Sequence, residues 1–119
     1  MSWFLAKIVY RIICGEGNHT AQFDEQLRLI EAEDETAAFE KARKIGDQEQ
    51  EIFLNQQQKL VHWQFVNVSE LYKISELIDG AELYSRVEET ERADLYIETV
   101  HKKAAYLRSN ILQKFFQLF

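Results

Sequence analysis

An alternating pattern near the N-terminus constrains the fold of this chain most strongly. Between residues 3 and 14 every even position is apolar or aromatic, whereas the odd positions are mixed. A period of two with many β-branched residues is typical of a strand that buries one face. We therefore predict a strand here, with Cys14 on its core face. A small buried hydrophobe is a far commoner role for such a cysteine than a nucleophile.

A turn and a second strand are predicted next. Residues 15–18 read Gly-Glu-Gly-Asn, which supplies the positive φ angles that a hairpin loop needs. In residues 19–32 one face carries mainly apolar side chains and the other carries polar ones, with Glu25 interrupting the apolar set. The apolar set is Ala21, Phe23, Leu27 and Leu29, and the polar set is Gln22, Asp24, Gln26 and Arg28.

Asp34 is predicted to cap the N-terminus of a helix, with Glu35 in the first turn where the helix dipole favours an acid. The helical spacing of apolar residues runs through Ala38, Ala42 and Ile45 as far as Phe53. Gly46 lies inside this stretch. It indicates either close packing on the sheet or a helix end nearby.

Residues 60–87 are dense in aromatic and aliphatic side chains around one Asp79-Gly80 turn. Here His62 is expected to point outward if Trp63 points inward. The apolar phase then slips, which indicates a β-bulge near residues 65–67. Residues 81–88 are predicted as the fourth strand. Its link to the third is either a tight hairpin or a looser connection, which we favour because a hairpin would set two cations opposite each other.

From residue 92 onward the chain is predicted to form one long helix of about 42 Å. This length exceeds the width of a small sheet, so its apolar C-terminal turns would overhang the monomer and mark a partner. We expect residues 1–90 to form the core domain and residues 91–119 to pack on it and at a homodimer interface. The interface residues predicted are Leu107, Ile111, Phe115, Phe116, Leu118 and Phe119.

The predicted fold class follows from these elements. It is α+β, with a four-stranded antiparallel sheet, element order β-β-α-β-β-α, helices on one face and a long C-terminal helix. A length of 119 residues fits one such fold.

Composition narrows the compartment and the partners. The single cysteine cannot form an internal disulfide, and the N-terminal apolar run is interrupted by Lys7 and Arg11, so we expect a cytoplasmic protein without a membrane span. A net charge of −6 makes nucleic acid an unlikely partner.

Motifs for catalysis and cofactor binding are absent from the sequence. It contains no phosphate-binding glycine loop, no nucleophile elbow and no pair of Cys or His at metal-binding spacing. We therefore predict no catalytic residue, no metal and no cofactor, and we lean against an enzyme. The alternative is a small-ligand or enzyme cleft near the 60–87 stretch, built from Lys7, His62, Glu82 and Tyr84.

A third hypothesis is nucleic-acid binding by the outer sheet face. Lys7, Arg11, Arg28 and Arg86 would supply cations there, with Trp3, His62 and Tyr84 nearby. A solvated face whose long side chains cover apolar surface is the simpler interpretation.

Four motifs, taken in order, carry a resemblance to a known family. They are Trp3-Phe4-x-x-Lys7, Trp63-x-Phe65, Glu70-Leu71-Tyr72 and Asp79-Gly80-x-Glu82-Leu83-Tyr84-Ser85. Together they resemble a family of small bacterial proteins catalogued as a domain of unknown function. The resemblance covers residues 3–87 and implies an α+β protein, without implying an activity. Our expectation is a non-enzymatic interaction module that acts as a homodimer, with a further protein partner possible.

Overall fold

The computed structural model of this chain describes residues 1–117. They fall into two compact units, the first of which ends at Ser85 and the second of which begins at Arg86. Each unit is described by itself below. The prediction that residues 91–119 pack on the core stays a prediction.

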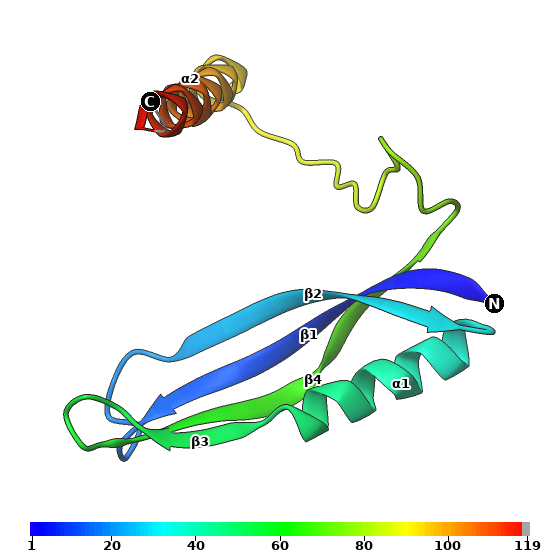
Figure 1. The fold of residues 1–119 in the computed structure, drawn as a ribbon, viewed down its shortest axis with the longest axis vertical. Helices are drawn as coiled ribbons and strands as arrows, with labels where there is room; N and C mark the ends of the chain where they lie inside the picture. Colours follow the sequence, from blue (N-terminus) through cyan, green and yellow to red (C-terminus); the bar gives the residue numbers. More distant parts are fainter. Residues whose placement is uncertain (118–119) are drawn as a thin grey trace. The chain divides into compact units, whose positions relative to one another are not determined.

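The first unit is a four-stranded antiparallel sheet with one helix. The strands β1 (Ser2–Cys14), β2 (Gln22–Ala32), β3 (Glu51–Leu54) and β4 (Leu60–Ile74) are arranged in the order β2-β1-β4-β3. The helix α1 (Glu35–Gln48) lies across one face of this sheet and contacts β1, β2 and β4 (Figure 1). The second unit contains the helix α2 (Ala93–Gln117). The predicted α+β class is therefore confirmed.

The core lies between β1 and α1. Phe4, Ile8 and Tyr10 on β1 are almost fully buried, and Ala38 and Ala42 on α1 are completely buried against them. Burial of each large side chain contributes about 1.5–3 kcal/mol. The two alanines, four residues apart on one side of α1, let the helix backbone approach the sheet closely.

Helix α1 begins and ends for identifiable reasons. Asp34 is extended, and its Oδ1 accepts a hydrogen bond of 2.8 Å from the backbone N–H of Ala37, as predicted for an N-cap. The helix ends at Gln48, five residues earlier than the apolar spacing indicated. Residues 51–54 instead form β3, because Ile52 and Phe53 suit either a helix stripe or a short strand and pairing with β4 selects the strand.

The other correction concerns residues 81–88, which were predicted as the fourth strand. Asp79-Gly80 does form a turn, in which the N–H of Ala81 donates to the carbonyl of Ile78 and Gly80 has a positive φ of 81°. No strand follows this turn as far as residue 117; the fourth strand is 60–74. Where the pattern predicted backbone pairing, this segment instead contacts the sheet through the ring of Tyr84, which meets the ring of Tyr72.

The bulge predicted in β4 is present, and a second one accompanies it. Val9 pairs with Asn67 and Tyr10 with Phe65, which leaves Val66 as an extra residue. Ser69 is extra in the same way between the partners of Lys7 and Ile8. Each bulge shifts the phase of β4 by one residue, and Phe65, Val68 and Leu71 therefore all pack against the core at spacings of three.

Neither helix, within the residues that the structure describes, is both long and apolar enough to cross a lipid bilayer.

Gly46 marks the closest approach of α1 to the sheet. Its carbonyl accepts a 2.9 Å hydrogen bond from the Tyr10 hydroxyl, and a Cβ atom at this position would overlap the ring of Phe65. We predict that Gly46→Ala lowers the free energy of unfolding by about 1–3 kcal/mol, as overpacking does elsewhere. Urea denaturation measures this change. Lys44→Ala, on the exposed side of the same helix, is the control and should change stability by less than about 0.5 kcal/mol.

Candidate functional site

The face of the sheet opposite α1 is the candidate site, and we call it the open face. Residues directly opposite each other in an antiparallel pair point to the same side, so the register assigns each side chain to a face. The open face comprises Trp3, Leu5, Lys7, Val9, Arg11 and Ile13 on β1; Phe23, Glu25, Leu27, Leu29 and Glu31 on β2; Ile52 and Leu54 on β3; and Leu60, His62, Gln64, Asn67, Glu70, Tyr72 and Ile74 on β4.

Strand β2 is oriented against its own hydrophobic pattern. Its polar residues Asp24, Gln26 and Arg28 lie on the α1 side and are half-buried, whereas Phe23, Leu27 and Leu29 lie on the open face and are 45–55 % exposed. The two sets predicted from the sequence are therefore correct. In a sheet that is covered on one side the apolar set would be expected to face the cover, but in β2 it faces away from α1.

One end of the open face holds a cluster of cationic, acidic and aromatic side chains. Lys7 Nζ lies 2.9 Å from Glu70 Oε2 and 5.9 Å from the centroid of the Tyr84 ring. The Tyr84 ring meets Tyr72 edge to face, with centroids 5.5 Å apart. Tyr84 thus anchors the segment that follows Ile74 onto the sheet.

The cluster also changes how its members titrate. The hydrogen bond with Glu70 raises the pKa of Lys7 above its ordinary value, although partial desolvation opposes this. Desolvation raises the pKa of Tyr72, and the charge of Glu70 adds to the effect. Lys7 is therefore held as a cation and Tyr72 as a neutral phenol at physiological pH, so neither is prepared to act as a base.

The structure brings together two of the four predicted ligand residues. Lys7 and Tyr84 meet in the cluster, whereas His62 pairs with Ile13 near the far end of β1, about 20 Å from Lys7 along the strand. Glu82 is exposed in the irregular segment after the Asp79-Gly80 turn. Glu70 joins the cluster although it was not among the predicted ligands. The phase slip in β4 is the signal that would have placed it opposite Lys7.

The cations proposed for nucleic-acid binding do not share one face. Lys7 and Arg11 lie on the open face, but Arg28 points to the α1 side, where it forms an ion pair with Glu49. Arg86 belongs to the second unit and pairs with Glu88 at 3.3 Å. The expected basic patch is therefore divided between two faces. Even-numbered residues of β2, such as Arg28, face α1, whereas odd-numbered residues of β1, such as Lys7, lie on the open face.

A polar network fills the α1 side of β2 beyond the end of the helix. Trp63 Nε1 donates a 3.0 Å hydrogen bond to Asp24 Oδ2, which also accepts one from Gln26. Arg28 donates in turn to Gln26 and to Glu49. These groups line a cavity of about 750 Å³, and their mutual hydrogen bonds account for their half-buried positions.

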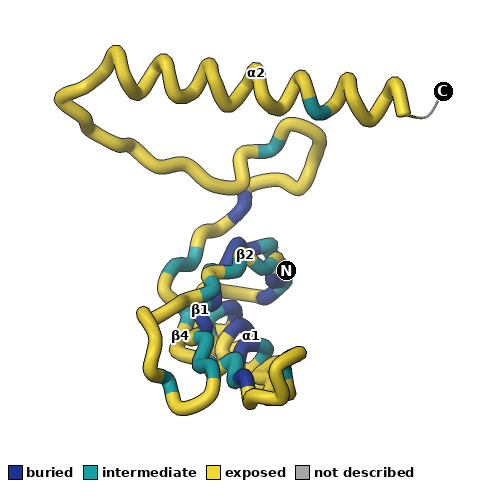
Figure 2. Tube along the Cα trace, turned by 90° about the vertical axis from the view of Figure 1, so that its left-hand side faces the viewer, coloured by how far each residue is buried: buried dark blue, intermediate teal, exposed yellow. Residues whose placement is uncertain are grey.

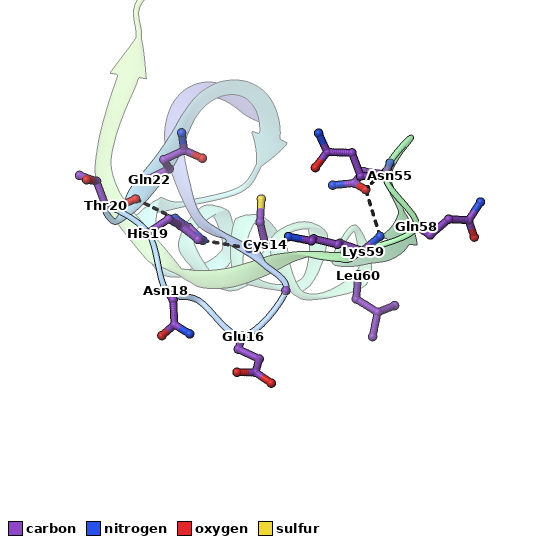
Figure 3. A pocket seen from close by; sticks show the side chains of 12 residues that line it. Cys14, Glu16, Asn18, His19, Thr20, Gln22, Asn55, Gln58, Lys59 and Leu60 are labelled. Atoms are coloured by element: carbon purple, nitrogen blue, oxygen red, sulfur yellow. Dashed lines mark hydrogen bonds between the residues drawn. The ribbon is translucent and has the colours of Figure 1, made fainter.

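A second concavity, of about 1100 Å³, lies between the β1–β2 and β3–β4 turns (Figure 3). His19 closes the first turn: its Nε2 lies 3.0 Å from the backbone N–H of Cys14, and its Nδ1 lies 2.8 Å from the carbonyl of Thr20. The ring therefore braces the turn and does not form a pair with the Cys14 thiol. The concavity lacks the nucleophile and base geometry that covalent catalysis needs.

Within residues 1–117 no group of three or more His, Cys, Asp or Glu side chains could hold a metal ion.

Helix α2 exposes its apolar side chains along its whole length. None of its described residues is buried (Figure 2). The predicted interface residues Leu107, Ile111, Phe115 and Phe116 are all more than half exposed, and the rings of Phe115 and Phe116 contact each other. Leu118 and Phe119, which completed that prediction, lie outside the described residues.

We predict that Tyr84→Ala lowers the free energy of unfolding by about 1 kcal/mol, because its ring packs on the open face. Urea denaturation of the single and double variants with Tyr72→Ala gives the coupling between the two rings. The effect of Tyr84→Ala should shrink when Tyr72 is already alanine. Additive effects would contradict the contact. Tyr106→Ala, on the exposed surface of α2, is the control and should be nearly neutral.

Comparison with known proteins gives the same C-terminal boundary as the first compact unit. No curated protein and no solved structure matches the chain. A family model does match residues 3–85, and its last residue is also the last residue of the first compact unit. Since this match spans more than half of the sequence, the chain belongs to the family described as a domain of unknown function, DUF4288.

Proposed function

We propose that this protein is a non-enzymatic interaction module that associates with a second copy of itself through α2. The observation that carries the proposal is the exposed apolar stripe of this helix. Tyr96, Ile97, Val100, Leu107 and Ile111 are each about half exposed or more. Most helical stability in proteins comes from packing an amphipathic face, and a stripe of this size calls for a partner.

The spacing of the stripe suits a helix partner. The spacing between successive small or apolar residues alternates between three and four, which is the a/d pattern of paired helices. These residues are Ile97, Val100, Ala104, Leu107 and Ile111. At 1.5 Å per residue the helix is about 37 Å long, or roughly three and a half heptads. Ala104 near its middle lets two helices approach closely.

The charges of α2 favour an antiparallel pair. Its first two turns carry Asp94 and Glu98 and no cation, whereas residues 100–117 carry four cations and no carboxylate. A parallel pair would set like charges beside each other at both ends. An antiparallel pair places the acidic first turns of one helix beside Arg108 and Lys114 of the other, with helix dipoles that also oppose. A two-fold axis produces this arrangement and closes the assembly as a dimer.

The proposal takes the protein to be cytoplasmic, because its single cysteine gives no sign of an oxidising compartment. It assigns no chemistry to the open-face cluster, since Lys7 and Tyr72 are both held in forms that do not accept a proton.

Single cysteines introduced into a Cys14→Ser background test the pairing and its direction. In an antiparallel dimer Ala104→Cys lies beside its own copy, and we expect efficient coupling by a short thiol crosslinker. Ala93→Cys lies about 30 Å from its copy and should not be coupled. Lys102→Cys, on the opposite side of the helix from the stripe, is the matched control and should also remain uncoupled.

Denaturing electrophoresis measures the crosslinked fraction. Absence of coupling at Ala104→Cys would refute pairing through the stripe. Equal coupling at Ala93→Cys and Ala104→Cys would refute the antiparallel arrangement and indicate a parallel pair.

A further inference from the structure

The open face of the first unit exposes apolar side chains. Strand β1 is apolar on both sides: Phe4, Ile8 and Tyr10 point to α1, while the buried Leu5 and the half-buried Val9 lie on the open face. Strands with two apolar faces are typical of sheets buried on both sides. Beside them Phe23, Leu27 and Leu29 form a half-exposed row on β2. At the end near Lys7 and Tyr72 the face is already covered in part by Tyr84, and Leu5 and Ile74 are buried there, so the exposed apolar surface is mainly the β2 row.

We propose that the open face of one copy packs against the open face of a second copy, sheet on sheet. This inference goes beyond the pairing of α2, because it concerns residues 1–85 and would hold if α2 paired with nothing. Two facing sheets pack about 10 Å apart, and the side chains of their inner faces interdigitate. A two-fold axis makes the same surface serve both partners.

The charge of the open face is compatible with such a partner. The chain as a whole carries −6, so two copies repel each other in general. The open face carries Lys7 and Arg11 against Glu25, Glu31 and Glu70, a net charge of only −1. Lys7 and Glu70 already neutralise each other within the face. The exposed Arg11 is available to Glu25 of the second copy.

The size of the open face lies near the lower limit for a dimer contact. Strands β1 and β2 pair over eleven residue pairs, which span about 37 Å at 3.4 Å per residue. Three strands about 4.8 Å apart give a flat area of about 500 Å², and the corrugated side chains expose more than this. Stable interfaces begin near 600 Å² per partner, so the face suits a contact of the weaker class, with a dissociation constant in the micromolar range.

The experiment uses the full chain in a background of Leu107→Asp and Ile111→Asp, which removes the α2 stripe. Sedimentation equilibrium should still detect a dimer at about 10–100 µM in this background. Adding Leu27→Asp should weaken that association at least tenfold, because it buries an added carboxylate whose directly opposite residue, Lys7, is already paired with Glu70. Ile78→Asp, at an apolar residue that lies outside the sheet and is 63 % exposed, is the matched control and should leave association unchanged.

A background variant that is monomeric throughout, or equal effects of Leu27→Asp and Ile78→Asp, would overturn the sheet contact. Neither result would bear on the crosslinking of α2, so the two proposals fail separately. Circular dichroism confirms folding, which Leu27→Asp should preserve because Leu27 is 50 % exposed.

Thiol labelling tests the same contact without introducing a charge. Leu29→Cys in the Cys14→Ser chain should react with a maleimide roughly five- to tenfold more slowly at about 200 µM protein than at about 1 µM, because a dimer with a dissociation constant of about 1–10 µM covers it at the higher concentration. Ile78→Cys should react at the same rate at both concentrations. A slow rate at both concentrations would mean that the chain covers its own face, and a fast rate at both would mean that nothing covers it. Either result would overturn the proposal.

Discussion

The pairing register of β1 with β2 and β4 is the constraint on which the rest of this structure depends. It turns Phe4, Ile8 and Tyr10 toward α1 and leaves Leu5, Val9 and the apolar row of β2 on the other side. A slip of one residue would exchange the two faces of a whole strand, and the strong apolar set on β1 prevents it. The same register therefore builds the core and produces a second apolar surface that α1 does not cover.

The two bulges in β4 and the ring of Tyr84 complete the domain. Val66 and Ser69 reset the phase of β4, so that Phe65 and Leu71 reach the core while Glu70 comes opposite Lys7. The Lys7 ammonium of the resulting Lys7–Glu70 ion pair lies over the ring of Tyr84. The compact unit ends at the residue after Tyr84, and the match to the DUF4288 family ends at the same residue, 85.

The sequence predicted those parts of the fold that rest on long patterns. The alternation in residues 3–14, the Asp34 cap and the first bulge follow from local periodicity and capping chemistry, and the structure contains all three. The predictions were wrong for short segments whose pattern fits more than one structure. Ile52 and Phe53 fit a helix stripe and a short strand equally well, and residues 81–85 are held by one tertiary ring contact instead of a ladder. The orientation of β2 depends on its partner β1, so no pattern within β2 alone could reveal it. The grouping of Lys7 with Tyr84, and the distance of His62 from both, likewise depend on pairing over long sequence separations.

Self-association accounts for both the stripe of α2 and the β2 row of the open face, since both are apolar side chains that stay exposed in their own unit. The measurement that tests this most directly is the mass of the unmodified full chain in solution, by sedimentation equilibrium over a range of concentrations. The account predicts a dimer at micromolar concentrations, with twice the chain mass of 14.1 kDa. A mass of 14.1 kDa at every concentration up to the solubility limit would contradict it.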